Sequence, residues 1–228
     1  MIALLGKLLV ENVSIDKRIA PDMKSKRTID DVVALYGEDA GCRLAPYLAK
    51  AGFATIPEKL ALLAFKQEQQ VEMWGYAKRS WSLIKTYPFT ATSGRLGPKL
   101  REGDRQIPEG IYRIIFLHPN SSYHLSLKIN YPNAFDKAMA RQEGRSNPGG
   151  EIFFHGKAAT IGCIPLGDQA IEEIFVLVSR VGKTHVEVII APVDFRQGKA
   201  KPDIQGIMWE HRLYDQIEQS LQPFVHVR

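Results

Sequence analysis

The feature that most constrains the fold is a series of short apolar or alternating segments that begins at Leu60. Turn-forming Gly, Pro, Asn and Ser residues separate these segments, which is typical of successive β-strands. Between Val71 and Thr90, apolar and polar residues partly alternate, as they do on a sheet with one face in water. The predicted strands are residues 60–67, 70–76, 81–92, 110–119, 122–130, 151–156 and 185–192. We therefore expect a β-rich core.

Helical patterns lie before the strands. Thr28, with Asp31 three residues later, is close to a capping box, and apolar residues at helical spacing follow it. A second short helix is expected to follow and to end near Gly52, with Pro46 either in its first turn or at a kink. Cys42 lies in this helix, and we predict that it is a small core residue.

Two further helices are predicted among and after the strands. Residues 167–182 contain Asp168 as a good N-cap and an apolar stripe that runs from Ala170 to Val181. A last helix is expected over residues 207–221. The fold class that fits is α+β: a β-rich sandwich or barrel with flanking helices, preceded by a small helical segment.

Composition excludes several classes of protein. The chain of 228 residues is 45% hydrophobic and 24% charged, which is ordinary for a globular protein with one sizeable core. The net charge of +5 weakly favours an anionic partner, although a solvated basic surface explains it equally well. No apolar run reaches the roughly 18 residues that span a bilayer. The apolar start of the chain is either the remnant of an export signal or an amphipathic first helix.

One stretch, FFHGKAATIGCIPLGD over residues 153–168, brings a His and a Cys together in a small-residue segment. A thiol becomes a nucleophile as thiolate, which requires a nearby base or positive field. His155 is the natural base if the loop returns Cys163 to face it. Gly162 permits unusual backbone angles, and the N–H groups of Gly162 and Cys163 are expected to form an oxyanion hole. The spacing alone leaves the alternative open: a buried Cys in a turn and a His bonded to a backbone carbonyl.

Other motifs are weaker. Two cysteines form neither a disulfide framework nor a four-thiolate zinc site, and the six histidines have no zinc-ligand spacing. We therefore expect no metal and no cofactor. Basic residues are not interleaved with stacking aromatics, so nucleic acid is not an expected partner. The segment SGRLGPKLREGD lacks the ending of a phosphate loop, and we interpret it as a loop between strands. Its basic side chains, Arg95, Lys99 and Arg101, are candidates to meet an anionic ligand.

Residues 155–175, HGKAATIGCIPLGDQAIEEIF, resemble the His-Gly and Ser/Thr-x-Gly-Cys signature of the YkuD-type L,D-transpeptidases. Upstream blocks make the match more specific, because FKQEQQVEMW, KTYPFTATSGRLGPKLREGDRQIPEGIY and HPNSSYHLSLKINYPNAFD are similar to the YafK branch of that family. The resemblance covers roughly Leu60 to Val181. It implies a catalytic domain over residues 58–193, between an N-terminal arm and helical segment (1–57) and a C-terminal helical extension (194–228).

The resemblance also implies roles for single residues. Cys163 matches the nucleophile, His155 the general base, Gly162 the glycine before the nucleophile, and Gly156 and Thr160 the remaining motif positions. Three departures from many members stand out. The His-to-Cys segment is much shorter here, Ile161 stands where those members have a second His, and Pro165 stands where they have an Arg. Because that Arg is missing, we predict that Arg141 and Arg145 hold a substrate carboxylate, with exposed loop arginines as the alternative. Tyr123 and Tyr131 are candidates to shape the cleft, with core packing as the alternative.

The implied function is a cysteine-dependent enzyme acting on peptidoglycan stem peptides at an L,D bond, by transpeptidation or by hydrolysis as an amidase or L,D-carboxypeptidase. The expected location is the periplasm or another exported compartment of a bacterium. The partners are stem peptides and, through the YafK resemblance, a wall-linked lipoprotein. Two alternatives stay open: a catalytically silent peptidoglycan-binding module, and a secreted effector that damages a competitor's wall.

Overall fold

A computed structural model describes residues 26–225 of the chain. Its centre is an eight-stranded sheet in the order β3-β2-β1-β8-β4-β5-β6-β7. The strands are β1 (Lys59–Phe65), β2 (Gln70–Ala77), β3 (Ser80–Pro88), β4 (Gly110–His118), β5 (Ser126–Ile129), β6 (Phe153–His155), β7 (Ile164–Pro165) and β8 (Val186–Ala191). Neighbours pair antiparallel except β1 with β8 and β6 with β7, which run parallel. The predicted α+β class with a β-rich core is confirmed.

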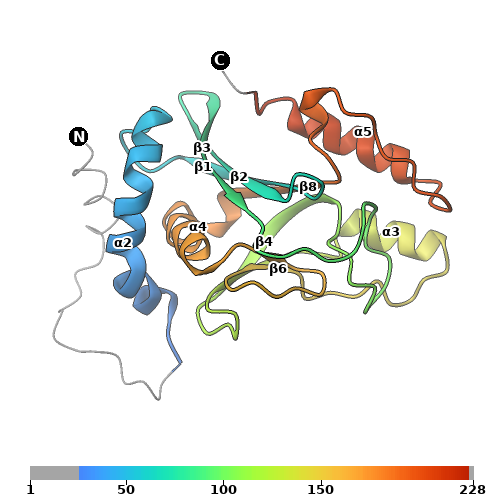
Figure 1. The fold of residues 1–228 in the computed structure, drawn as a ribbon, viewed down its shortest axis with the longest axis horizontal. Coiled ribbons are helices and arrows are strands. Elements are labelled where there is room, and N and C mark those ends of the chain that lie inside the picture. Colours follow the sequence, from blue (N-terminus) through green and yellow to red (C-terminus); the bar gives the residue numbers. More distant parts are fainter. Residues whose placement is uncertain (1–25, 226–228) are drawn as a thin grey trace.

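Helices cover both faces of the central strands (Figure 1). They are α2 (Ile29–Lys50), α3 (Ala134–Gln142), α4 (Asp168–Val181) and α5 (Glu210–Leu221). Helix α4 packs on one face and α2 packs against α4, whereas α5 packs on the opposite face against β8 and β4. Short 3-10 helices, Lys183–His185 and Phe195–Gln197, flank β8.

The sequence of β1 explains this layering. Alternate side chains of a strand point to opposite faces. Leu60, Leu62 and Ala64 belong to the core cluster beneath α4, and Ala61, Leu63 and Phe65 to the cluster beneath α5. Since both faces are covered, the strand is apolar at every buried position rather than alternating.

Helix α2 corrects two predictions. The capping box of Thr28 and Asp31 is present, but one helix of 22 residues replaces the two that we expected. Pro46 lies inside it, and the helix continues to Lys50 because buried side chains such as Leu44 and Leu48 dock its length on the core. Cys42 is exposed, so the prediction that it is a core residue is wrong.

The structure also corrects the prediction for Asp168 and contains two elements that we did not predict. Gly167 occupies the N-cap position of α4 without a side-chain cap, and Asp168 instead accepts a hydrogen bond from the N–H of Lys157 at 2.8 Å. Asp168 therefore fixes the preceding loop and does not cap its helix. Helix α3 was not predicted, although Asn133 and Asp136 form a capping box at its start. Strand β7 was also missed, because two residues are too few to show a period.

Within residues 26–225, no helix combines the length and apolar character that crossing a bilayer requires.

Candidate active site

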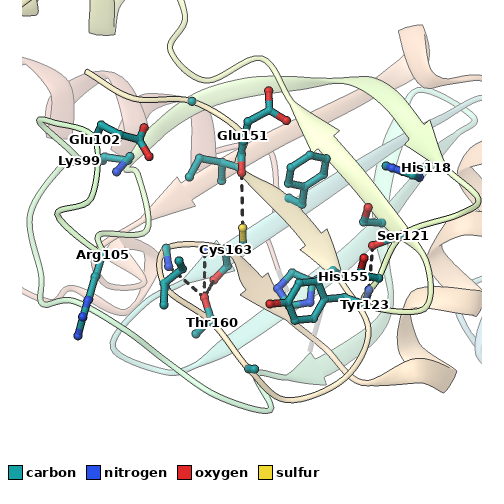
Figure 2. A pocket seen from close by; sticks show the side chains of 18 of the residues that line it. Lys99, Glu102, Arg105, His118, Ser121, Tyr123, Glu151, His155, Thr160 and Cys163 are labelled. Carbon is teal, nitrogen blue, oxygen red and sulfur yellow. Dashed lines mark hydrogen bonds between the residues drawn. The ribbon is translucent and has the colours of Figure 1, made fainter. Parts of the chain in front are cut away.

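A pocket of about 670 Å³ lies where the end of β4, β5, β6 and four loops meet, and both His155 and Cys163 line it (Figure 2). The loops are residues 89–109 between β3 and β4, residues 119–125 between β4 and β5, residues 143–152 between α3 and β6, and residues 156–163 after β6. The predicted catalytic pair therefore faces a common cavity.

His155 is the last residue of β6 and is buried. The register places it opposite Ser126 of β5, and its carbonyl accepts from the N–H of Leu166 at 2.9 Å. Its Nδ1 lies 2.6 Å from the carbonyl oxygen of Gly156. Because a carbonyl only accepts, Nδ1 carries the proton in the neutral ring, and Nε2 keeps a free lone pair. The Tyr123 ring packs on the imidazole with centroids 4.6 Å apart.

Cys163 precedes β7 at the end of the loop that starts at Gly156. Its Sγ contacts the carbonyl oxygen of Glu151 at 3.7 Å, as Figure 2 shows. Thr160 fixes the turn before it: Oγ1 accepts from the N–H groups of Gly162 at 3.1 Å and Cys163 at 2.9 Å, and donates to the Cys163 carbonyl at 2.8 Å. The two N–H groups expected to form an oxyanion hole are thus bonded to Thr160 in this conformation.

Two glycines are required by their surroundings. A Cβ on Gly156 would lie 2.5 Å from Asp168 Oδ1 and 2.7 Å from the Tyr123 carbonyl oxygen. Gly162 has φ of 133°, which other residues rarely adopt, and a Cβ there would lie 3.1 Å from the Gln106 carbonyl oxygen. Both glycines allow the loop to pack closely on its neighbours.

Burial sets the resting charge of the pair. Burial lowers the pKa of His155, and the hydrogen bond to Gly156 offsets only part of this effect. Burial also raises the pKa of the Cys163 thiol, against smaller lowering effects from a backbone hydrogen bond and from Lys99. Both shifts favour the neutral forms. Among the described residues no hydrogen bond joins thiol and imidazole, so the pocket is lined by a neutral thiol and a neutral imidazole and not by a preformed ion pair.

The wall opposite the His–Tyr side is the 89–109 loop, which has no regular secondary structure. Asp104 organises it: its carboxylate accepts from Lys99 Nζ at 2.6 Å and from three backbone N–H groups, those of Leu100, Arg101 and Gln106. Burial alone would raise the pKa of Asp104, but these donors hold it below the usual value. Lys99 is buried and lines the pocket.

The predicted substrate-binding residues divide into two groups. Tyr123 lines the pocket. Tyr131 is buried behind the wall, and its hydroxyl donates to the carbonyl of Pro148 at 2.8 Å and lies within a longer 3.3 Å of the Lys99 carbonyl. Arg141 lines a separate depression beside α3, and Arg145 donates to the Leu100 carbonyl at 2.6 Å. The structure therefore does not place Arg141, Arg145 or Tyr131 among the residues that line the pocket.

Several residues that line the pocket were not predicted. Arg105 is the one arginine among the described lining residues; it is exposed and takes part in no ion pair within residues 26–225. The basic SGRLGPKLREGD segment, which includes all but the last residue of the stretch up to Arg105, was the sequence signal for a cationic wall. Of its three candidates, Arg95, Lys99 and Arg101, Lys99 alone lines the pocket. The other unpredicted charged or polar lining side chains include Glu102, His118, Ser121, Ser126 and Glu151.

Outside the pocket, one group of the described residues contains side chains of the kinds that bind metal ions. Asp203, Glu210 and His211 bring one potential ligand atom each to within 4.8 Å of one another. Glu210 is buried and accepts from the Ile204 N–H, so its carboxylate has a structural partner already. None of the three lines the pocket.

Comparison with known proteins identifies the family of the chain. The model of the YkuD L,D-transpeptidase catalytic domain matches residues 61–190. The chain is 32% identical over 169 residues to the Escherichia coli (strain K12) protein named "Putative L,D-transpeptidase YafK", and the match covers 70% of this chain. It spans 66% of the length of that relative.

Two solved structures are more distant. The helical cell shape determining protein Pgp2 from Campylobacter jejuni is 22% identical with a TM-score of 0.48, over 69% of this chain and 55% of Pgp2. Bd1075 from Bdellovibrio bacteriovorus is 20% identical with a TM-score of 0.44, over 73% of this chain and 55% of that chain. The family model covers more than half of the sequence, including the His155–Cys163 segment. The chain belongs to the YkuD family of L,D-transpeptidase catalytic domains.

Proposed function

We propose that this protein is a cysteine-dependent enzyme that cleaves stem peptides of peptidoglycan at an L,D bond through a thioester on Cys163. One observation carries the proposal: His155 and Cys163 line one pocket, and the bond from His155 Nδ1 to the Gly156 carbonyl leaves Nε2 free to act as a base. Membership of the YkuD family supports the same chemistry.

In the first half-reaction, His155 Nε2 takes the thiol proton while Sγ attacks the carbonyl carbon of the L-residue. The carbon–nitrogen bond then breaks, and the leaving amine takes the proton back from the imidazolium. The product is a thioester on Cys163. Since the resting pair is neutral, the thiolate forms only as substrate engages, and protonation of His155 at acid pH abolishes the reaction.

The tetrahedral oxyanion requires donors. The N–H groups of Gly162 and Cys163 fill this role in our proposal, which requires that they release or share their bond to Thr160 Oγ1. The turn that Thr160 maintains keeps both N–H groups on the same side of the loop. Thr160 thus acts on the site through the backbone and not through contact with substrate.

In the second half-reaction an acceptor attacks the thioester. An amine gives transpeptidation and water gives hydrolysis, and His155 takes the proton of either nucleophile and returns one to the thiolate. A lipoprotein joined to the stem through an amine is one leaving group that the first half-reaction would release, and hydrolysis would then free the stem peptide from Cys163. We further propose that the enzyme works in the periplasm or an equivalent exported compartment, where stem peptides are found.

The pocket wall suggests how an anionic substrate is held. Lys99 and Arg105 are the cationic lining groups among the described residues, and the Lys99 ammonium already has Asp104 as its counter-ion. Arg105 is therefore our candidate for contact with a stem carboxylate, in place of Arg141 and Arg145. A guanidinium binds a carboxylate in a bidentate manner, which gives direction as well as charge.

The test is digestion of defined tetrapeptide and pentapeptide muropeptides, with and without a free D-amino acid, with products identified by mass. Cys163→Ala is expected to abolish turnover, and His155→Ala to lower kcat by several orders of magnitude, since losing nucleophile or base removes the acyl-transfer path. Exchange with the D-amino acid indicates transpeptidation, and loss of the terminal residue without exchange indicates hydrolysis. The exposed Cys42 provides the matched control, because Cys42→Ala leaves turnover unchanged. Full activity of the Cys163→Ala protein would refute the proposal.

A further inference from the structure

We infer that the C-terminal extension positions the 89–109 wall of the pocket through a hydrogen-bonded relay of three side chains: Trp209, Glu143 and Arg145. This inference rests on the proposed function only in so far as that wall binds substrate. The contacts themselves join three segments that are far apart in the sequence.

The last hydrogen bond of the relay joins Arg145 to the 89–109 wall. Arg145 Nη1 donates to the carbonyl oxygen of Leu100 at 2.6 Å, and Leu100 lies between Lys99, which lines the pocket, and the Asp104-capped turn. Tyr131 binds the neighbouring Lys99 carbonyl from the same interior side. The backbone that presents Lys99 and Arg105 to the pocket is thus anchored from behind at two successive carbonyls.

The middle of the relay is Glu143, the residue that follows α3. Its Oε2 accepts from Arg145 Nε at 2.7 Å and pairs with Nη2 at 2.6 Å, so two nitrogens of the guanidinium converge on one oxygen. Its Oε1 accepts from Trp209 Nε1 at 2.6 Å. One carboxylate therefore orients the arginine and is itself held by the indole.

The relay starts in the C-terminal extension. Trp209 is the residue before α5, is buried, and packs edge-on against Phe135 of α3 with ring centroids 5.7 Å apart. Helix α5 in turn belongs to the apolar cluster on the far face of the sheet. The indole is thus fixed by packing, and its N–H presents a directed donor to Glu143.

Arg145 and Glu143 are consequently positioning residues that act through the wall, not residues that touch substrate. Loss of either link frees the Leu100 segment without altering His155 or Cys163. We expect the wall to open locally more often, substrate to bind less tightly and the chemical step to be preserved.

The test uses two variants that break different links. Trp209→Phe removes the N–H donor, and Glu143→Gln leaves one acceptor oxygen in place of two, so the side chain keeps only one of its two links and loses its charge opposite Arg145. Both are treated with trypsin, and cleavage after Arg101 and Arg105 is followed by mass. Loss of one charge-assisted hydrogen bond is expected to accelerate these cleavages about tenfold, because cleavage follows the open population. With active enzyme, KM rises several-fold and kcat stays within about twofold of wild type.

Controls separate the relay from general destabilisation. Cleavage after Arg79, in the exposed turn between β2 and β3, stays at the wild-type rate. Trp81→Phe makes the same substitution at an indole that packs against Phe224 and donates to no described residue, and it leaves cleavage after Arg101 and Arg105 unaffected. Because the two links are in series, the double variant is cleaved no faster than the faster single variant.

Equal acceleration at Arg79, or unchanged cleavage at Arg101 and Arg105, would overturn the relay. So would additive effects in the double variant. The Glu143 side chain lies near the surface, so we expect the Glu143→Gln protein to fold. This variant therefore tests the relay even if Trp209→Phe does not fold. The trypsin experiment requires no muropeptide. If the wild-type protein is inactive on muropeptides, the proposed function is refuted, but the rates of trypsin cleavage still test the relay.

Discussion

Two walls enclose the pocket, and they are held in different ways. The 89–109 loop is tied to the protein interior: Lys66 Nζ donates to the carbonyls of Gly97 and Ile107, and pairs with Glu109 at 2.9 Å, with both side chains almost fully buried. The 119–125 loop is tied at the surface, where Arg27 donates to the Pro119 carbonyl and exchanges hydrogen bonds with Asn120.

The difference lies in the free-energy cost of breaking each tie. Breaking a buried ion pair strands a charge out of water, whereas a broken surface hydrogen bond is replaced by water. One wall is therefore preorganised, and the other, which carries Tyr123 against the His155 imidazole, is held less firmly.

The largest expected effect is that of Glu109→Ala. Glu109 accepts from Gly97 N–H at 2.7 Å and Tyr214 hydroxyl at 2.8 Å in addition to pairing with Lys66. Its removal leaves a buried ammonium without a counter-charge, and we expect the free energy of unfolding to fall by about 3–5 kcal/mol. Urea denaturation followed by circular dichroism measures this.

A double variant provides the control for that prediction. Lys66→Met with Glu109→Gln removes both charges, and the amide introduced in place of the carboxylate still has an oxygen to accept from Gly97 or Tyr214. We expect it to recover part of the lost stability, since an uncharged pair carries no stranded charge. If the double variant is no more stable than Glu109→Ala, charge is not what fixes this wall.

An intermediate effect is expected where α4 supports the other wall. Glu172 accepts from Arg43 and lies 2.8 Å from His124 Nε2, and its side chain is 12% exposed. Glu172→Ala should lower the free energy of unfolding by about 1.5–3 kcal/mol, the range for hydrogen bonds to charged groups. Glu172→Gln keeps an acceptor and should lose less. Equal losses in thermal melts of both variants would show that the acceptor is irrelevant.

The smallest effect is that of Arg27→Ala. It removes the side-chain donor to the Pro119 carbonyl at 2.7 Å but leaves the backbone bonds to Asn120 intact. We expect about 0.5–1.5 kcal/mol of stability to be lost. Hydrogen exchange should accelerate within residues 119–125 and be unchanged within residues 89–109. Faster exchange in both loops would mean that the two walls are not held independently.

Most of the scaffold was predictable because it depends on local pattern. The seven predicted strands are present, since apolar runs between turn residues bury themselves in only a few ways. The errors have physical causes: α2 crosses Pro46 because tertiary burial outweighs one missing hydrogen bond, and Cys42 faces water because its position on the helix is set by what α2 docks against. The domain division at residues 57 and 193 and the catalytic roles of His155 and Cys163 stay predictions.

By itself, the sequence determined the α+β scaffold, the family and the candidate pair His155 and Cys163, because those depend on residues close together in the chain. Only the tertiary structure decided what surrounds the pair. It placed Arg105 and Lys99 at the pocket and moved Arg145 and Tyr131 behind its wall, where they bind Leu100 and Lys99 carbonyls. Contacts between residues 30 or more positions apart leave no period in a sequence, so which arginine faces the cavity is settled only when the sheet and its helices pack.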